Sequence, residues 1–134
     1  MFLLDTNVIS EARRGSMEAG RWLAPIAPDR LFLSVLTLGE IERGMLKLGR
    51  RDPVGAKRIA DWRDTLRIYY ENRILPITNE IALEWGRLPA GRTIGVADAL
   101  IAATAIVHGL TMVTRNARDF EETGVILINP WAEA

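Results

Sequence analysis

The 134-residue chain contains no cysteine, which excludes a disulfide framework, a thiolate metal site and a cysteine nucleophile. Its 17 basic residues balance 17 acidic ones, so it lacks the strong positive charge of proteins that hold nucleic acid by counterion release. No apolar run reaches the ~18 residues that a membrane-spanning helix needs, and the first residues lack a secretion signal, so we expect one soluble, cytoplasmic domain over residues 1–134.

In the first half of the chain, short apolar runs alternate with segments of helical periodicity. The expected elements, in order, are a strand at 2–4, helices at 7–13 and 16–24, a strand at 31–33 and a helix at 35–48. Gly15 and Pro25 mark the ends of the first two helices. Ser34 suits the N-cap of the third helix, because its hydroxyl can accept a hydrogen bond from the first turn.

The second half of the chain continues this alternation. Its expected elements are a helix at 53–71, a strand at 74–77, helices at 79–87 and 96–108, a strand at 110–113, a short helix at 117–121 and a strand at 125–128. Pro53 is favourable at the first position of a helix. Thr78 suits an N-cap, and Gly109 ends the most apolar of the helices.

The predicted strands are apolar throughout, without the alternation of a half-exposed sheet. Strands of this kind, separated by helices, indicate a mainly parallel sheet of about five strands in a three-layer α/β/α sandwich. Ligands of such sheets bind beyond the carboxyl ends of the strands. Functional acids are therefore expected just after strands or in the helices that follow them.

Four acids meet that condition: Asp5, Glu40, Asp98 and Asp119. Two carboxylates about 5 Å apart repel by roughly 3 kcal/mol at an effective dielectric near 20. Several converging carboxylates could therefore not all stay ionised without a cation. Because the donors are oxygen atoms with no cysteine or nearby histidine, that cation is expected to be Mg²⁺, with Mn²⁺ possible.

Each of these acids also has a purely structural interpretation. Asp5 or Asp98 could be the N-cap of the helix beside it. Glu40 could complete a capping box with Thr37, although Ser34 is the better helix start. Asp119 could be a solvated acid on a short surface helix.

The segments that carry the acids resemble the motifs of PIN domains, and of the VapC and FitB toxin branch in particular. These segments are residues 3–11, 40–44, 98–104 and 114–120. They occur in the family's order and at its spacing, so the resemblance covers essentially the whole chain. It implies a PIN-like fold and a Mg²⁺- or Mn²⁺-dependent endoribonuclease. Its metal-binding and catalytic acids would be Asp5, Glu40, Asp98 and Asp119.

The resemblance also implies polar side chains that support the acids, namely Thr6, Asn7, Thr114 and Asn116. Its implied partners are an RNA substrate, a second copy of the chain in a homodimer, and a cognate antitoxin through which DNA is contacted only indirectly. Some relatives have a second acid beside the last aspartate. Here Arg118 and Phe120 flank Asp119, which leaves one or two metal ions open.

Hydrolysis of RNA by such a site requires bound ions that lower the pKa of a water molecule and stabilise charge on the phosphate. Candidates for RNA contact are the basic residues Arg13, Arg14, Arg43, Lys47, Arg50 and Arg51, together with Arg115 and Arg118 near Asp119. These charges could also form only a solvated surface. Trp62 and Trp85 could stack bases, but their helical spacing with aliphatic residues favours packing.

Two other functions remain open at this point. The same acids could serve a nuclease that acts on DNA, because a carboxylate–metal centre does not distinguish ribose from deoxyribose. The chain could instead be a non-catalytic PIN-fold binding module. The cost of gathering charged carboxylates argues against a pure scaffold.

Overall fold

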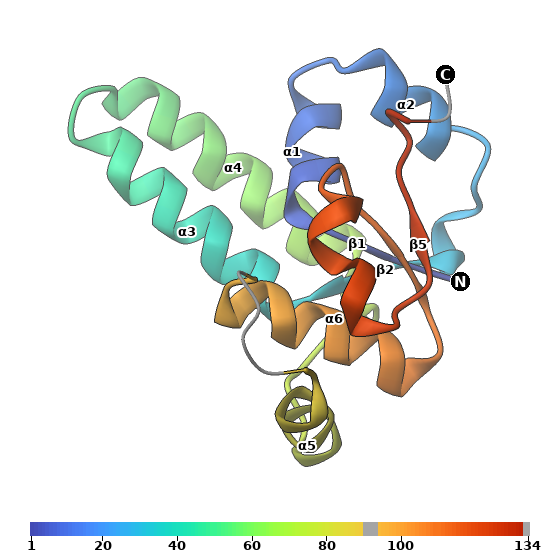
Figure 1. The fold of residues 1–134 in the computed structure, drawn as a ribbon. Coiled ribbons are helices and arrows are strands. Elements are labelled where there is room, and N and C mark those ends of the chain that lie inside the picture. The colour runs from blue at the N-terminus through green and yellow to red at the C-terminus, as the bar shows by residue number, and fades with distance from the viewer. Residues whose placement is uncertain (90–93, 133–134) are drawn as a thin grey trace.

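A parallel five-stranded sheet forms the centre of the structure (Figure 1), a computed structural model that describes residues 1–89 and 94–132. The strand order is β3-β2-β1-β4-β5, with bounds β1 Phe2–Leu4, β2 Leu31–Ser34, β3 Ile74–Leu75, β4 Thr111–Val113 and β5 Leu127–Ile128. In the register of the central strands, Phe2 pairs with Leu31 on one side and Thr111 on the other. The predicted fold class is confirmed.

The helices lie where the sequence predicts them, with ends that differ by a residue or two. Their bounds are α1 Thr6–Arg13, α2 Met17–Leu23, α3 Val35–Gly49, α4 Pro53–Tyr69, α5 Asn79–Arg87 and α6 Val96–His108. The segment Ala117–Thr123 is a 3₁₀ helix, η2, and a further 3₁₀ turn, η1 (Pro28–Arg30), was not predicted. The predicted caps form, since Ser34 accepts a hydrogen bond from the Leu36 backbone N–H and Thr78 accepts one from Ile81.

The edge strands are shorter than predicted. Strand β3 ends at Leu75 instead of continuing to residue 77, because Pro76 has no backbone N–H to donate to a neighbouring strand. Strand β5 begins at Leu127, since the chain first turns at Gly124 with φ of 83°. Both differences lie away from the central strands that carry the predicted acids.

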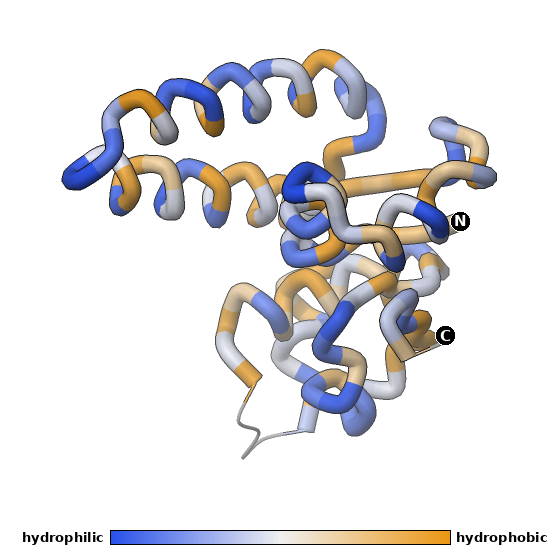
Figure 2. Tube along the Cα trace, turned by 90° about the horizontal axis from the view of Figure 1, so that it is seen from above, coloured by the Kyte–Doolittle hydropathy of each residue, from blue (hydrophilic) through white to orange (hydrophobic). Residues whose placement is uncertain are grey.

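Two apolar cores cover the two faces of the sheet, and successive residues of β1 point into different cores. Leu4 packs with side chains of α1, α3 and α4, whereas Leu3 packs against α6 and η2. Leu3 and Leu4 are both 0% exposed, and complete burial of such a side chain stabilises the fold by about 1.5–3 kcal/mol. Figure 2 shows the apolar strands enclosed between layers whose outer turns are hydrophilic.

Helices α3 and α4 form an antiparallel pair that projects beyond the sheet in both views (Figures 1 and 2). In the part of the chain that is described, no helix has the length and hydrophobicity needed to span a membrane. The carboxyl ends of β1, β2 and β4 lie side by side, because these strands are parallel neighbours. Residues that follow them therefore meet at one edge of the sheet.

Candidate active site at the carboxyl edge of the sheet

Asp5 lies at the centre of this edge, directly after β1, and is only 5% exposed. Its Oδ1 accepts a hydrogen bond from the Thr6 backbone N–H at 2.8 Å, so Asp5 is also the N-cap of α1. Its Oδ2 accepts hydrogen bonds from the Thr114 hydroxyl at 2.8 Å and the Asn7 side-chain amide at 3.3 Å. A carboxylate offers about four lone-pair positions, so capping leaves Asp5 able to bind a further ligand.

The surroundings of Asp5 oppose its ionisation. The pKa of Asp5 rises from 3.8 to about 6, chiefly because burial removes the carboxylate from water. The charges of Asp98 and Glu40 also raise it. The hydrogen bonds from Thr114 and from the Thr6 backbone act in the opposite direction, and they do not cancel the cost of burial.

Glu40 is held by a pair of threonines. On α3, its Oε1 accepts a hydrogen bond from the Thr6 hydroxyl at 2.7 Å, and the Thr6 and Thr37 hydroxyl oxygens are 3.0 Å apart. A hydroxyl has a single proton to donate. When Thr6 donates to Glu40, Thr37 must therefore donate to Thr6. This gives a directed chain from Thr37 through Thr6 to the carboxylate.

Thr37 is a site residue that sequence reasoning missed. The sequence suggested it only as half of a capping box with Glu40, but α3 begins at Val35 and is capped by Ser34. Thr37 is 0% exposed. The available signal was the spacing, since residues three apart on a helix lie on the same face.

Asp98 lies inside the first turn of α6, whose N-cap position is Gly95, so the capping interpretation of Asp98 is wrong. Burial raises the pKa of Asp98, and the nearby charge of Asp119 raises it as well. Asp119 is exposed on η2. The two acids therefore interact even though one is half-buried and the other faces solvent.

The remaining predicted polar residues join the ends of β1 and β4. The Asn7 side-chain oxygen accepts a hydrogen bond from the Arg115 backbone N–H at 3.1 Å. Thr114, which is 0% exposed, accepts one from the Asn116 backbone N–H at 3.1 Å. Asn7 and Thr114 thus tie the turn after β4 to the start of α1 and hold Asp5 between them.

The donor chemistry of this edge fits a hard divalent cation, since its charged groups are carboxylates. The electrostatic neighbours are the pairs Asp5–Glu40, Asp5–Asp98 and Asp98–Asp119, so the acids form a row. Within residues 1–89 and 94–132, no group of three acidic or histidine side chains is already arranged to hold a metal ion. Ligation by three carboxylates at once therefore requires side-chain rotation.

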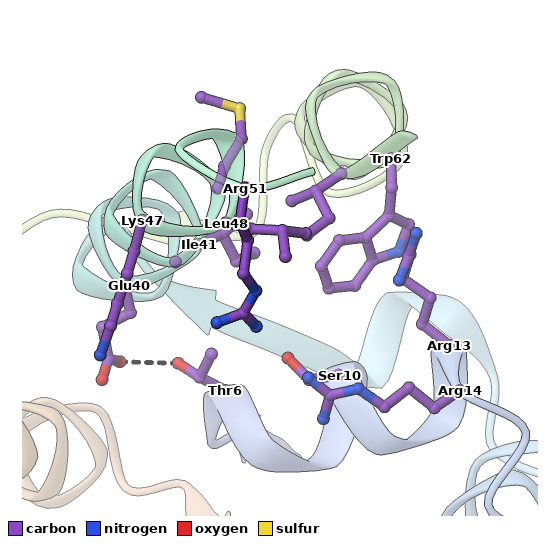
Figure 3. Close-up of a pocket in the computed structure, with 13 residues that line it drawn as sticks. Thr6, Ser10, Arg13, Arg14, Glu40, Ile41, Lys47, Leu48, Arg51 and Trp62 are labelled. Atoms are coloured by element: carbon purple, nitrogen blue, oxygen red, sulfur yellow. Dashed lines mark hydrogen bonds between the residues drawn. The ribbon is translucent and has the colours of Figure 1, made fainter. Parts of the chain in front are cut away.

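A cavity of about 470 Å³ opens beside Glu40, between α1, α3 and α4 (Figure 3). Its size is within the range of ligand-binding sites. Thr6 and Glu40 line the end next to the acidic edge, and Ile41, Ile59 and Trp62 supply apolar surface. The basic side chains that line it are Arg13, Arg14, Lys47 and Arg51.

Four of the basic residues predicted for RNA contact line this cavity, and the others lie elsewhere. Arg43 is exposed on α3, Arg118 is exposed on η2, and neither lines this cavity. The Arg115 guanidinium lies 5.2 Å from the centre of the Trp131 ring, and one of its nitrogens is 3.9 Å from a Glu11 carboxylate oxygen.

Comparison with known proteins gives a consistent result. Residues 2–126 match the family described as the PIN domain. The chain is 32% identical to the VapC ribonuclease Y4jK of Sinorhizobium fredii, over the full length of both proteins. It resembles the crystal structure of FitAcB from Neisseria gonorrhoeae with a TM-score of 0.84 and 32% identity, covering 98% of this chain and 99% of that one. A toxin–antitoxin complex from Klebsiella pneumoniae matches with a TM-score of 0.72 and 25% identity, over 97% of this chain and 98% of that one. The acids, the parallel sheet and these relatives together place the chain in the PIN domain family.

Proposed function

We propose that this chain is a metal-dependent endoribonuclease that acts in the cytoplasm as the toxin of a toxin–antitoxin pair. The observation that carries the proposal is the setting of Asp5. Its carboxylate is buried, and its pKa rises to about 6. Burial is the main cause, and the nearby charges of Asp98 and Glu40 also raise the pKa. Burying neighbouring carboxylates costs free energy, and such clusters are typical of sites where the carboxylates bind a cation or take part in catalysis. The full-length similarity to a VapC ribonuclease supports RNA as the substrate.

The acids proposed to hold Mg²⁺ or Mn²⁺ are Asp5, Glu40, Asp98 and Asp119. When bound, the ion would lower the pKa of a water molecule that it holds and stabilise negative charge on the phosphate. The protein's own contribution is orientation. Thr114 and the Thr6 backbone N–H fix the two oxygens of Asp5, while the Thr37–Thr6 chain fixes Glu40.

The chain offers few residues that could act as a general base. The sequence contains a single histidine, His108, which is the last residue of α6, whereas Asp98 lies in the first turn of the same helix. A helix rises about 1.5 Å per residue, so this histidine is roughly 15 Å further along the axis. We therefore propose no histidine general base, because a bound divalent ion would itself lower the pKa of the attacking water molecule.

Two protein partners belong to the proposal. A cognate antitoxin is supported by the similarity to a toxin–antitoxin complex, and DNA would be contacted only through it. A second copy of the chain is supported by exposed apolar side chains on α5 and at the start of α6. Leu83 is 61%, Trp85 41% and Val96 64% exposed, and exposed apolar surface of this kind is typical of interfaces.

Cleavage of labelled single-stranded RNA in Mg²⁺ or Mn²⁺ tests the proposal. Asp98→Asn should lower the rate by at least 100-fold with unchanged circular dichroism. Asp61→Asn is the matched control, because Asp61 is exposed on α4 and pairs with Lys57 away from the site. Full activity in excess EDTA would refute the metal requirement.

Parallel assays separate the alternatives. Equal cleavage of DNA of the same sequence would support a nuclease without preference for ribose. Absence of cleavage, together with absence of heat on calorimetric titration with Mn²⁺, would support a binding module. The present proposal requires RNA cleavage and Mn²⁺ binding that Asp98→Asn weakens.

A further inference from the structure

The cavity beside Glu40 gathers positive charge in a chain that has no net charge. Of the residues that the structure describes, four with cationic side chains line it, whereas Glu40 is the only acidic one that does so. Among the described residues, neither Lys47 nor Arg51 forms an ion pair, so their charges are available to a ligand. The cavity therefore favours an anionic occupant.

The basic side chains converge from two helices. Figure 3 shows Lys47 and Arg51 extending from the end of α3 towards α1, while Arg14 extends into the same space from the end of α1. Arg14 also pairs with Glu11 at 3.2 Å, at an exposed position where such pairs are weak. Cations on both sides of one space can contact successive oxygens of a phosphodiester backbone.

The far end of the cavity offers a flat surface. There the Arg13 guanidinium lies over the Trp62 ring, 5.3 Å from its centre (Figure 3). Indole rings and guanidinium planes are surfaces on which unpaired RNA bases stack. Trp62 is half-buried against the core formed with α4, so this surface is fixed in position.

We propose that this cavity binds one nucleotide of the RNA strand next to the phosphodiester that is cleaved. Lys47, Arg51 and Arg14 contact its phosphate oxygens, and its base lies against the Arg13–Trp62 pair. The inference rests on the proposed function, because Glu40 joins the cavity to the acidic edge. Of the basic residues predicted for RNA contact, it selects those that line the cavity and leaves out Arg43, Arg115 and Arg118.

Charge favours an RNA strand over an apolar segment of a protein partner. A purely apolar peptide would leave the cations of the cavity without partners, whereas an RNA strand supplies an anion at each nucleotide. An RNA strand that occupies the cavity would also lead directly to the acidic edge, since Thr6 and Glu40 belong to both the cavity and that edge.

Binding of labelled single-stranded RNA, measured by fluorescence anisotropy as a function of salt, provides the test. The Asp98→Asn chain is used throughout, so that binding is measured without cleavage. Arg51→Ala should weaken binding about 10-fold, and the loss of one phosphate contact should reduce the slope of log affinity against log salt by about 0.7.

Arg50→Ala is the matched control. It removes the same charge from the neighbouring residue, but Arg50 lies on a different surface hollow with Leu46 and Pro53. Affinity and slope should stay as in the parent chain. Equal effects of Arg50→Ala and Arg51→Ala would overturn the proposal, as would an unchanged slope in Arg51→Ala, which would leave the cavity to a protein partner.

The base contact is tested at Trp62. Trp62→Leu should weaken RNA binding about 5- to 150-fold, whereas Trp62→Phe should largely retain it, because a ring remains. Thermal unfolding checks that both variants are folded. As an independent measurement, RNA carrying 4-thiouridine should cross-link to residues of the cavity. Cross-links confined to other surfaces would refute the inference.

The assignment of the cavity and the proposed function can be refuted independently of each other. If wild-type protein does not cleave RNA, the ribonuclease proposal is wrong whatever the binding slopes are. If it cleaves RNA but Arg51→Ala and Trp62→Leu bind RNA normally, only the assignment of the cavity is wrong.

Discussion

Replacing Asp5 with asparagine should separate stability from activity. The carboxylate is 5% exposed, and its pKa rises from 3.8 to about 6 in the folded chain. Each pKa unit corresponds to ~1.36 kcal/mol, so holding the charge in the folded state costs roughly 3 kcal/mol at neutral pH. Asp5→Asn removes that charge and keeps a side chain of the same shape.

The sign of the pH dependence follows from proton linkage. Between pH 4 and pH 6 the folded chain holds a proton on Asp5 that the unfolded chain has released, so this group makes the protein less stable as pH rises. Below pH 4 both states are protonated and the penalty disappears. The stability of Asp5→Asn relative to wild type should therefore increase by roughly 2–3 kcal/mol between pH 4 and pH 8.

Urea unfolding of both chains in EDTA, at pH 4, 6 and 8, measures this difference. Hydrogen bonds lost or gained by the amide shift all three values alike, so the change with pH is the diagnostic quantity. RNA cleavage by Asp5→Asn should meanwhile be lost. A stability difference that stays constant from pH 4 to pH 8 would show that burial does not disfavour the Asp5 charge.

Three further substitutions test individual contacts. Thr37→Val should lower the cleavage rate about 3- to 10-fold by removing a hydrogen bond worth ~0.5–1.5 kcal/mol, and Thr37→Ser should restore it; equal rates for the two variants would refute the hydroxyl chain. Phe120→Ala, at a side chain 1% exposed, should lower the free energy of unfolding by about 3–5 kcal/mol in urea. Gly109→Ala should lower the same free energy by about 1–2 kcal/mol, because residue 109 has φ of 65°; an unchanged urea midpoint would contradict this.

Much of the fold was predictable because its signals are local. Ser34 and Thr78 stand at helix starts and Gly109 at a helix end, where a single side chain or its absence satisfies the backbone. The strands were recognised from uniformly apolar runs. Their ends depend on pairing with neighbours far away in sequence, so an apolar run alone does not show that β3 ends at Leu75, before Pro76.

The row of acids was predictable for a topological reason. Parallel strands deliver the residues that follow them to one edge of the sheet, so Asp5 and Thr114 meet although they are 109 positions apart. The cavity was not predictable in the same way. It exists because α1 packs beneath the α3–α4 pair, and the sequence alone does not state which face of α3 turns towards α1.

Arg50 and Arg51 illustrate the difficulty. They are adjacent, equally charged and both exposed, yet only Arg51 lines the cavity. Successive residues near the end of a helix point about 100° apart around its axis. Composition cannot distinguish them, and the distinction becomes visible only once the orientation of α3 is fixed by burial of Ile41 and Thr37.

The balanced charge of the chain has a different meaning once its charges are located. Zero net charge argues against RNA binding by counterion release over a whole surface, but it does not prevent segregation of charge. Basic side chains gather in the cavity and carboxylates gather at the adjacent edge, with Glu40 at the boundary. Such neighbouring surfaces of opposite charge can position an RNA strand. The cations of the cavity hold one phosphate, and the next phosphate then lies at the acidic edge, whose carboxylates repel it. On the proposed function a divalent ion offsets that repulsion, so RNA affinity for the acidic edge, unlike affinity for the cavity, should rise when Mg²⁺ is added.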